Sequence, residues 1–248
     1  MPDVARSTPG DADATGHSGE PAGHRRIGSL LNSLRAAVLG ANDGIVSVAG
    51  IVVGVAGATT DLIVVLTAGV AGLLAGALSM AAGEYVSVST QRDTERALLR
   101  HERHQLRVEP EQELDELTQL YRGKGLRPDL ARQVAEELTA ADAFRAHAEV
   151  ELRIDPDALN SPWQAAIASF GAFTAGALLP LLAIGLPPQP ARVPACFAAV
   201  VVALALTGAV SARLGHAPVL RATVRTVLGG VFAMAVTYGI GSLAGVRV

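Results

Sequence analysis

Five long apolar segments dominate this 248-residue chain and restrict what it can fold into. A helix that crosses a membrane needs about 20 consecutive apolar residues. Five segments meet that length: residues 36–58, 62–88, 163–186, 193–212 and 222–244. Only 17% of the residues are charged, against about 25% in soluble domains. A soluble chain of this size could not bury so many apolar runs, so the sequence predicts an all-α membrane protein with five spans.

The charged residues gather in the first 35 residues, in a block at 92–157 and in a patch at 213–225. The block between the second and third spans predicts an inserted domain of three amphipathic helices. The second span continues as a polar helix to about Val108, and Pro110 starts a second helix that ends at Gly123-Lys124-Gly125. A third helix begins near Asp129 and runs to about Leu152.

Four regions follow from this division. Residues 1–29 are rich in Pro, Gly, Asp and Ser and lack the apolar core of a signal peptide, so we expect a disordered tail. Residues 30–91 hold the first two spans, 92–157 the inserted domain and 158–248 the last three spans. The single cysteine, Cys196, excludes an intramolecular disulfide and a cluster of thiolate ligands.

Arginines predict the orientation, because basic residues favour the cytoplasmic side. They flank one side of the spans at Arg25, Arg26, Arg35, Arg92, Arg96, Arg100, Arg103, Arg213, Arg221 and Arg225. The opposite side carries only Arg192 and Arg247. We therefore expect the N-terminus and the inserted domain in the cytoplasm and the C-terminus outside.

Polar residues within the first two spans are candidate pore residues. A carboxylate such as Asp43 near the middle of a membrane costs about 2.5 kcal/mol or more, so it usually faces an ion or proton path. The alternative is that Asp43 is hydrated at the cytoplasmic end of its helix. Asn42 adds a second oxygen, and Met80 and Glu84 share one helix face. The mixture of thioether and carboxylate suits Fe²⁺ better than Mg²⁺ or Ca²⁺.

The inserted domain also carries possible metal ligands. Glu109, Glu113 and Glu116 lie at i, i+4 and i+7, and His147 and Glu151 lie at i and i+4. Glu102 precedes them on the first helix. Carboxylates with an imidazole would bind Fe²⁺, Mn²⁺ or Zn²⁺. The alternative is a glutamate-rich helix face that is simply solvated.

Three segments of the chain resemble the vacuolar iron transporter family. They are LRAAVLGANDGIVSVAGIVVG at 34–54, GLLAGALSMAAGEYVSVSTQRD at 72–93 and VTYGIG at 236–241. The resemblance runs from about residue 30 to the end. It implies a five-span homodimer that exports Fe²⁺, and often Mn²⁺, from the cytosol in exchange for protons, with the pore between the first and second spans of both subunits.

The resemblance also implies roles for individual residues. The family's intramembrane aspartate and methionine fall on Asp43 and Met80. Its three-helix insertion binds metal, and the glutamates of that insertion fall on Glu102, Glu113, Glu116 and Glu151. Gln105 replaces a further glutamate that is usual there, which puts one ion site in doubt. Some members carry a pair of methionines near residue 150, which this sequence lacks, and we expect His147 to compensate for them.

The predicted function is therefore divalent metal transport, with Fe²⁺, Mn²⁺, Zn²⁺ or Co²⁺ as bound or transported ion and no prosthetic group. The expected partners are protons, membrane lipid and a second copy of the chain, without nucleic acid. The alternative is a membrane-anchored metal-binding or sensing protein without transport. An enzyme is not expected, because the sequence shows no nucleophile–base pair, phosphate-binding loop or zinc motif. A composition rich in Ala, Val, Leu, Gly and Arg, with one Lys, predicts a bacterial plasma membrane.

Overall fold

A computed structural model describes residues 20–245 of the chain, with side-chain positions from residue 37 onward. Within this range the chain forms seven α-helices, one 3₁₀ turn and no strand. The elements are α1 (Glu20–Ala58), α2 (Leu62–Val108), α3 (Pro110–Gly123), α4 (Pro128–Val150), α5 (Pro162–Gly185), η1 (Gln189–Ala191), α6 (Arg192–Leu214) and α7 (Val219–Gly245). The observed class is the predicted one, because every described element is helical.

Five helices are long and apolar enough to cross a membrane: α1, α2, α5, α6 and α7. Their bounds follow the five predicted spans closely. One boundary differs: α1 already begins at Glu20, so helix occupies part of the tail that composition predicts to be disordered up to Ser29. The rest of that predicted tail lies outside the described residues.

The apolar helices pack into one bundle around a common core. Its fully buried side chains include Val52 of α1, Ile184 of α5, Leu204 of α6 and Met234 of α7. Glycine permits the closest approach, because a Cβ at Gly176 of α5 would meet the backbone carbonyl of Ala41 in α1. In lipid, such close backbone packing stabilises helix pairs through dispersion.

The outer surface of the bundle is strongly apolar. Exposed large side chains include Ile63, Leu206, Phe232 and Leu243. In water these side chains would cost free energy, whereas hydrocarbon is the solvent that suits them. The surface therefore agrees with an integral membrane protein.

Helix α2 is much longer than a membrane is thick. Its 47 residues span about 70 Å, whereas the hydrocarbon core is about 30 Å thick. Asp61 caps its start by accepting a hydrogen bond from the amide of Ile63 at 2.8 Å. If its apolar part (62–88) occupies the membrane, its polar part (92–108) must project beyond it.

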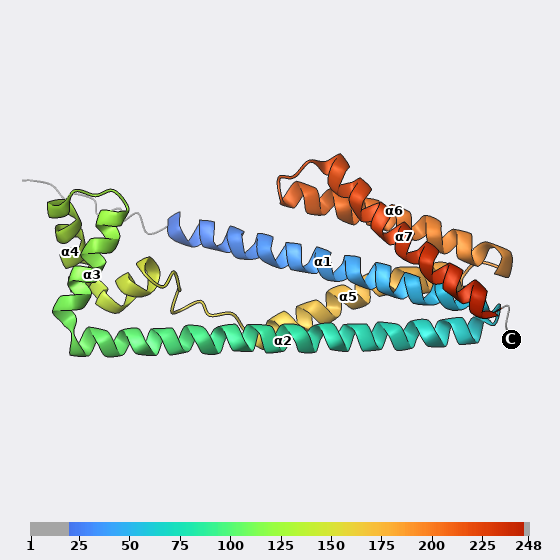
Figure 1. The fold of residues 1–248 in the computed structure, drawn as a ribbon, viewed down its shortest axis with the longest axis horizontal. Helices are drawn as coiled ribbons and strands as arrows, with labels where there is room; N and C mark the ends of the chain where they lie inside the picture. Colours follow the sequence, from blue (N-terminus) through green and yellow to red (C-terminus); the bar gives the residue numbers. More distant parts are fainter. Residues whose placement is uncertain (1–19, 246–248) are drawn as a thin grey trace, which may run out of the picture.

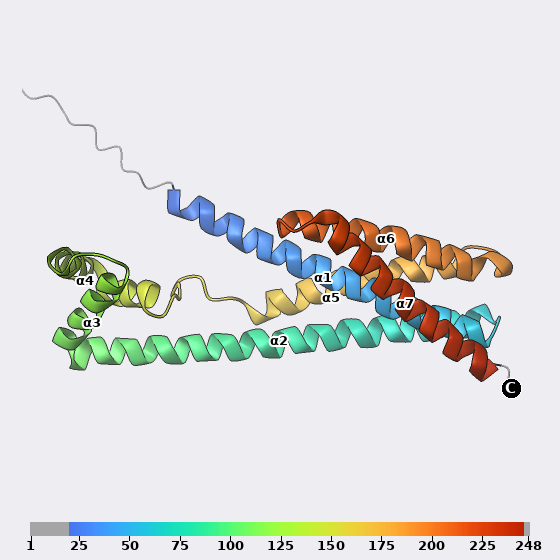
Figure 2. The same cartoon turned by 45° about the horizontal axis from the view of Figure 1, so that its top comes forward.

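Helices α3 and α4 pack against this projecting end of α2, away from the apolar bundle (Figures 1 and 2). The chain turns from α2 into α3 at a single residue, Glu109, and Pro110 occupies the first turn of α3. A small separate core holds the helices together, with Leu117, Ala135 and Ala146 buried in it. The three helices expected from the sequence are present, and α4 has a break at Asp142 that the sequence analysis does not predict.

Candidate metal centre

Four side chains converge at the far end of α2. Glu102 comes from α2, Glu113 from α3 and His147 from α4, and Glu151 directly follows α4. Each offers one ligand atom, and the four atoms lie within 4.8 Å of one another. The single-residue turn at Glu109 makes this possible, because it folds the first turns of α3 back against α2.

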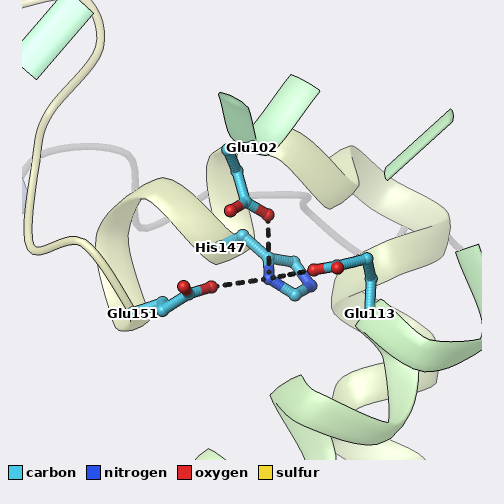
Figure 3. A group of neighbouring side chains, drawn as sticks. All are labelled: Glu102, Glu113, His147 and Glu151. Carbon is cyan, nitrogen blue, oxygen red and sulfur yellow. Dashed lines mark hydrogen bonds and ion pairs between the residues drawn. The ribbon is translucent and has the colours of Figure 1, made fainter. Parts of the chain in front are cut away.

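The imidazole of His147 lies at the centre of the group (Figure 3). Its Nδ1 atom is 3.1 Å from Oε1 of Glu102, 3.2 Å from Oε2 of Glu151 and 3.6 Å from Oε2 of Glu113. Three carboxylates thus point at a single nitrogen. That nitrogen can hold a proton or a metal ion, but not both.

Most of the cluster is shielded from water. His147 is fully buried, Glu102 is 2% exposed and Glu113 is 3% exposed. The pKa of Glu102 is raised to about 7: burial raises it most, the neighbouring carboxylates Glu151, Glu113 and Glu116 also raise it, and His147 lowers it. Burial also raises the pKa of Glu113. Buried carboxylates of one sign are costly unless a cation neutralises them.

Two atoms of the cluster lack a hydrogen-bond partner among the described residues. Oε1 of Glu102 faces Nδ1 of His147 without hydrogen-bond geometry, and Nε2 of His147 is likewise unpaired. Buried polar atoms are nearly always paired in folded proteins. An unpaired carboxylate oxygen that points into a group of other ligands is well placed to bind a metal ion.

The donor set indicates which ions would fit. Three carboxylates and one imidazole nitrogen are suitable ligands for Fe²⁺, Mn²⁺ or Zn²⁺, whereas Ca²⁺ prefers oxygen alone. Metal–ligand bonds of about 2.0–2.2 Å place ligand atoms at most about 4.4 Å apart. The observed separations need only small side-chain movements to reach that geometry.

The remaining predicted ligands lie around the cluster rather than in it. Glu109 and Glu116 are exposed, and Gln105 is half-buried. The charges of Glu109 and Glu116 still help to raise the pKa of Glu113, so both lie near the site. The backbone carbonyl of Gln105 accepts a hydrogen bond from the amide of Glu109 at 2.8 Å, which closes the last turn of α2.

The predicted pore residues occupy two different cavities. Asn42, Asp43 and Met80 line one of about 540 Å³. Asp43 is exposed and accepts a hydrogen bond from Oγ of Ser47 at 2.9 Å, and Oδ1 of Asn42 accepts one from Thr207 at 3.3 Å. Glu84 lines a separate polar cavity of about 450 Å³ between α2 and the start of α5. Met80 and Glu84 therefore share a helix but line different cavities.

Two features of these sites are missing from the sequence analysis. Arg225 lines the cavity of Asp43, although in the sequence it serves only as a marker of orientation. The break of α4 at Asp142 lies five residues before His147. Aspartate is a favoured N-cap residue, but Asp142 lies inside an apparently continuous helical pattern.

Comparison with known proteins identifies a family. The model of the VIT family matches residues 34–242. A vacuolar iron transporter of Acanthamoeba castellanii is 44% identical over 223 residues, which cover 89% of this chain and 82% of that protein. Vacuolar iron transporter homolog 1 of Oryza sativa subsp. japonica is 43% identical over 86% of this chain and 75% of its own length. Vacuolar iron transporter homolog 4 of Arabidopsis thaliana is 38% identical, with 86% and 84% covered.

Proposed function

Because this chain belongs to the VIT family, a family of membrane transporters of metal, we propose that it exports Fe²⁺, and also Mn²⁺, from the cytosol in exchange for protons. The observation that carries the proposal is the buried cluster of Glu102, Glu113, His147 and Glu151. It presents three carboxylates and an imidazole on the projecting end of a helix that also contributes Met80 to the membrane cavity.

The cluster would serve as the collecting site. An ion entering it neutralises carboxylates that burial otherwise holds at raised pKa. The exposed Glu109 and Glu116 at its rim add negative charge that attracts cations from solution. Binding releases the proton of Glu102, whose pKa is raised to about 7, so capture is favoured at neutral and higher pH.

The transport path would run through the cavity of Asn42, Asp43 and Met80. Carboxylate and amide oxygens with a thioether sulfur form a mixed site that suits a borderline ion such as Fe²⁺. Glu84, in its own polar cavity closer to the projecting domain, would receive the hydrated ion before it reaches Met80. Protonation of a carboxylate from the opposite side would then release the ion.

A second copy of the chain would complete the pore. Asp43 and Ser47 are exposed on the surface of the bundle. A charged carboxylate that faces lipid near the middle of the membrane costs about 2.5 kcal/mol or more of free energy. A homodimer that covers α1 and α2 would place Asp43 in an enclosed path instead. We place the inserted domain in the cytoplasm, on the side where Arg92, Arg96 and Arg100 follow the second span, and the protein in a bacterial plasma membrane.

Transport in liposomes tests the proposal. Purified protein is reconstituted with a pH indicator inside, and proton movement is followed after adding Fe²⁺, Mn²⁺, Co²⁺ or Zn²⁺ under a pH gradient. We expect metal-dependent proton flux that Asp43→Ala abolishes and His147→Ala shifts to higher metal concentrations. Metal binding without flux in the wild type would instead support a sensing protein. Wild-type exchange rates in Asp43→Ala would refute the pore assignment.

A further inference from the structure

Helix α4 is not one straight helix. Asp142 has an extended backbone (φ −163°, ψ 91°) in the middle of residues 128–150. The break divides α4 into a first segment, 128–141, and a second segment, 143–150, which carries His147; both contribute to the small core with α3. Figure 1 shows the last part of α4 turned away from the direction of its first part.

The side chain of Asp142 caps the second segment. Its Oδ1 accepts a hydrogen bond from the backbone amide of Arg145 at 2.9 Å. Arg145 is the third residue of the new segment, which is the position that an N-cap side chain usually serves. Asp142 itself is exposed, so its carboxylate contributes little to either hydrophobic core.

The break determines where the ligands lie. In an unbroken helix His147 would continue along the axis to about 9 Å beyond Ala141. His147 is instead fully buried, with Nδ1 within 3.6 Å of an oxygen of Glu102 and of Glu113. The change of direction at Asp142 brings the imidazole to the carboxylates of α2 and α3.

Other contacts attach the second segment but do not create the turn. The guanidinium of Arg103 on α2 lies 4.1 Å from the ring centre of Phe144. Arg145 forms ion pairs with Glu149 at 3.1 Å and with Asp157 at 3.3 Å. These ion pairs are largely exposed, and exposed pairs contribute little. The cap is the contact that specifically stabilises a helix start at this residue.

We infer that Asp142 is a positioning residue for the metal cluster: it stabilises the break of α4 that aims His147 and Glu151 at Glu102 and Glu113. The inference rests on the proposed metal-binding function, since without metal binding there is nothing to position. Asp142 is exposed whereas Glu102, Glu113 and His147 are buried, so it acts through the helix start that it caps.

Metal titrations of the full chain in detergent test the inference. Mn²⁺ affinity is measured by calorimetry and the environment of the bound ion by electron paramagnetic resonance. We expect Asp142→Ala to weaken Mn²⁺ binding about 5- to 10-fold and to change the spectrum. Asp142→Asn and Asp142→Ser lose the charge but keep a capping acceptor, so their Mn²⁺ affinities should lie within about twofold of the wild-type affinity. Asp129→Ala, an exposed aspartate in the first turn of α4, is the matched control.

A proline at the next position provides a second, independent variant. Proline is favoured at the first position of a helix and forces the preceding residue into an extended backbone. Ala143→Pro should therefore keep the break and bind Mn²⁺ as the wild type does. The double variant Asp142→Ala, Ala143→Pro should regain most of the lost affinity.

The binding results distinguish a role of the Asp142 cap from a role of its charge, and both from the absence of a metal site. Equal losses in the Ala, Asn and Ser variants would show that the charge of Asp142 matters rather than its cap, and would overturn the inference. Wild-type binding by Asp142→Ala, or loss of binding by Ala143→Pro alone, would also overturn it. Absence of Mn²⁺ binding in the wild type would instead refute the proposed collecting site.

Discussion

Replacing Glu102 by Gln should remove most of the pH dependence of metal binding. The pKa of Glu102 is about 7 in the folded protein, because the carboxyl is buried among other carboxylates. Metal binds the deprotonated form. At pH 6 about one-eleventh of the Glu102 side chains are deprotonated, and at pH 8 about ten-elevenths are. This group alone therefore raises the Mn²⁺ affinity about tenfold from pH 6 to pH 8.

The substitution should weaken Mn²⁺ binding at pH 8 but hardly change it at pH 6. Glu102→Gln keeps one oxygen but loses the charge, so at pH 8 we expect at least about tenfold weaker Mn²⁺ binding. At pH 6 the difference from the wild type should nearly disappear, because most wild-type side chains are already protonated there. Glu113, whose pKa is also raised by burial, is present in both proteins, so the comparison isolates mainly the contribution of Glu102.

Calorimetry in two buffers with different enthalpies of ionisation measures the affinity and the number of protons released. At pH 6 the variant should release about one proton fewer than the wild type per Mn²⁺ bound. Glu111→Gln, at an exposed position in the first turn of α3, is the control and should behave as the wild type. A variant that kept the wild-type pH dependence would refute the assignment of the raised pKa to a metal-binding carboxylate.

Three further outcomes are expected. The pKa of Glu102 is higher in the folded chain than the ordinary value of 4.5, so the folded state holds this proton more tightly. Without metal, the free energy of unfolding of the inserted domain should therefore fall by at most about 3 kcal/mol from pH 4.5 to pH 7 and stay lower above it. Glu102→Gln should lack this fall in melts followed by circular dichroism. Leu117→Ala empties a fully buried position in the small core and should destabilise this domain by about 2–5 kcal/mol, visible as earlier hydrogen exchange in α3 and α4, while exchange in α5 to α7 stays as in the wild type. Gly176→Ala places a methyl group against the carbonyl of Ala41 and should lower the yield of monodisperse protein in size-exclusion chromatography. The control Gly171→Ala, whose added methyl meets no atom within 4 Å, should not lower it. Equal yields would show that α1 and α5 can separate without cost.

The fold was largely predictable, because the physics of each span lies in its own sequence. About 20 apolar residues in a row identify a membrane helix without reference to any neighbour. The corner at Glu109 and Pro110 is equally local, since proline restricts where a helix can start.

The site was only partly predictable. Spacing along one helix brings His147 and Glu151 together, but the distances to Glu102 and Glu113 depend on how three helices pack. Spacing also grouped Met80 with Glu84, whereas Met80 lines a cavity with residues of α1 and α7 and Glu84 lines one with residues at the start of α5. The break at Asp142 escaped because alanines on both sides of it favour an unbroken helix. Neither the cap on the amide of Arg145 nor the packing of the second segment can be read from the spacing of residues.

The unbroken course of α2 determines how the two sites can communicate. Met80 and Glu102 are 22 residues apart on one helix, which holds them about 33 Å from each other. On the proposed path an ion leaving the cluster must cross this gap, with Glu84 near its membrane end. One ion within a sphere of that radius corresponds to a concentration of about 10 mM. A membrane cavity supplied in this way can bind its cargo weakly and still fill, and weak binding is what lets an ion leave quickly on the far side.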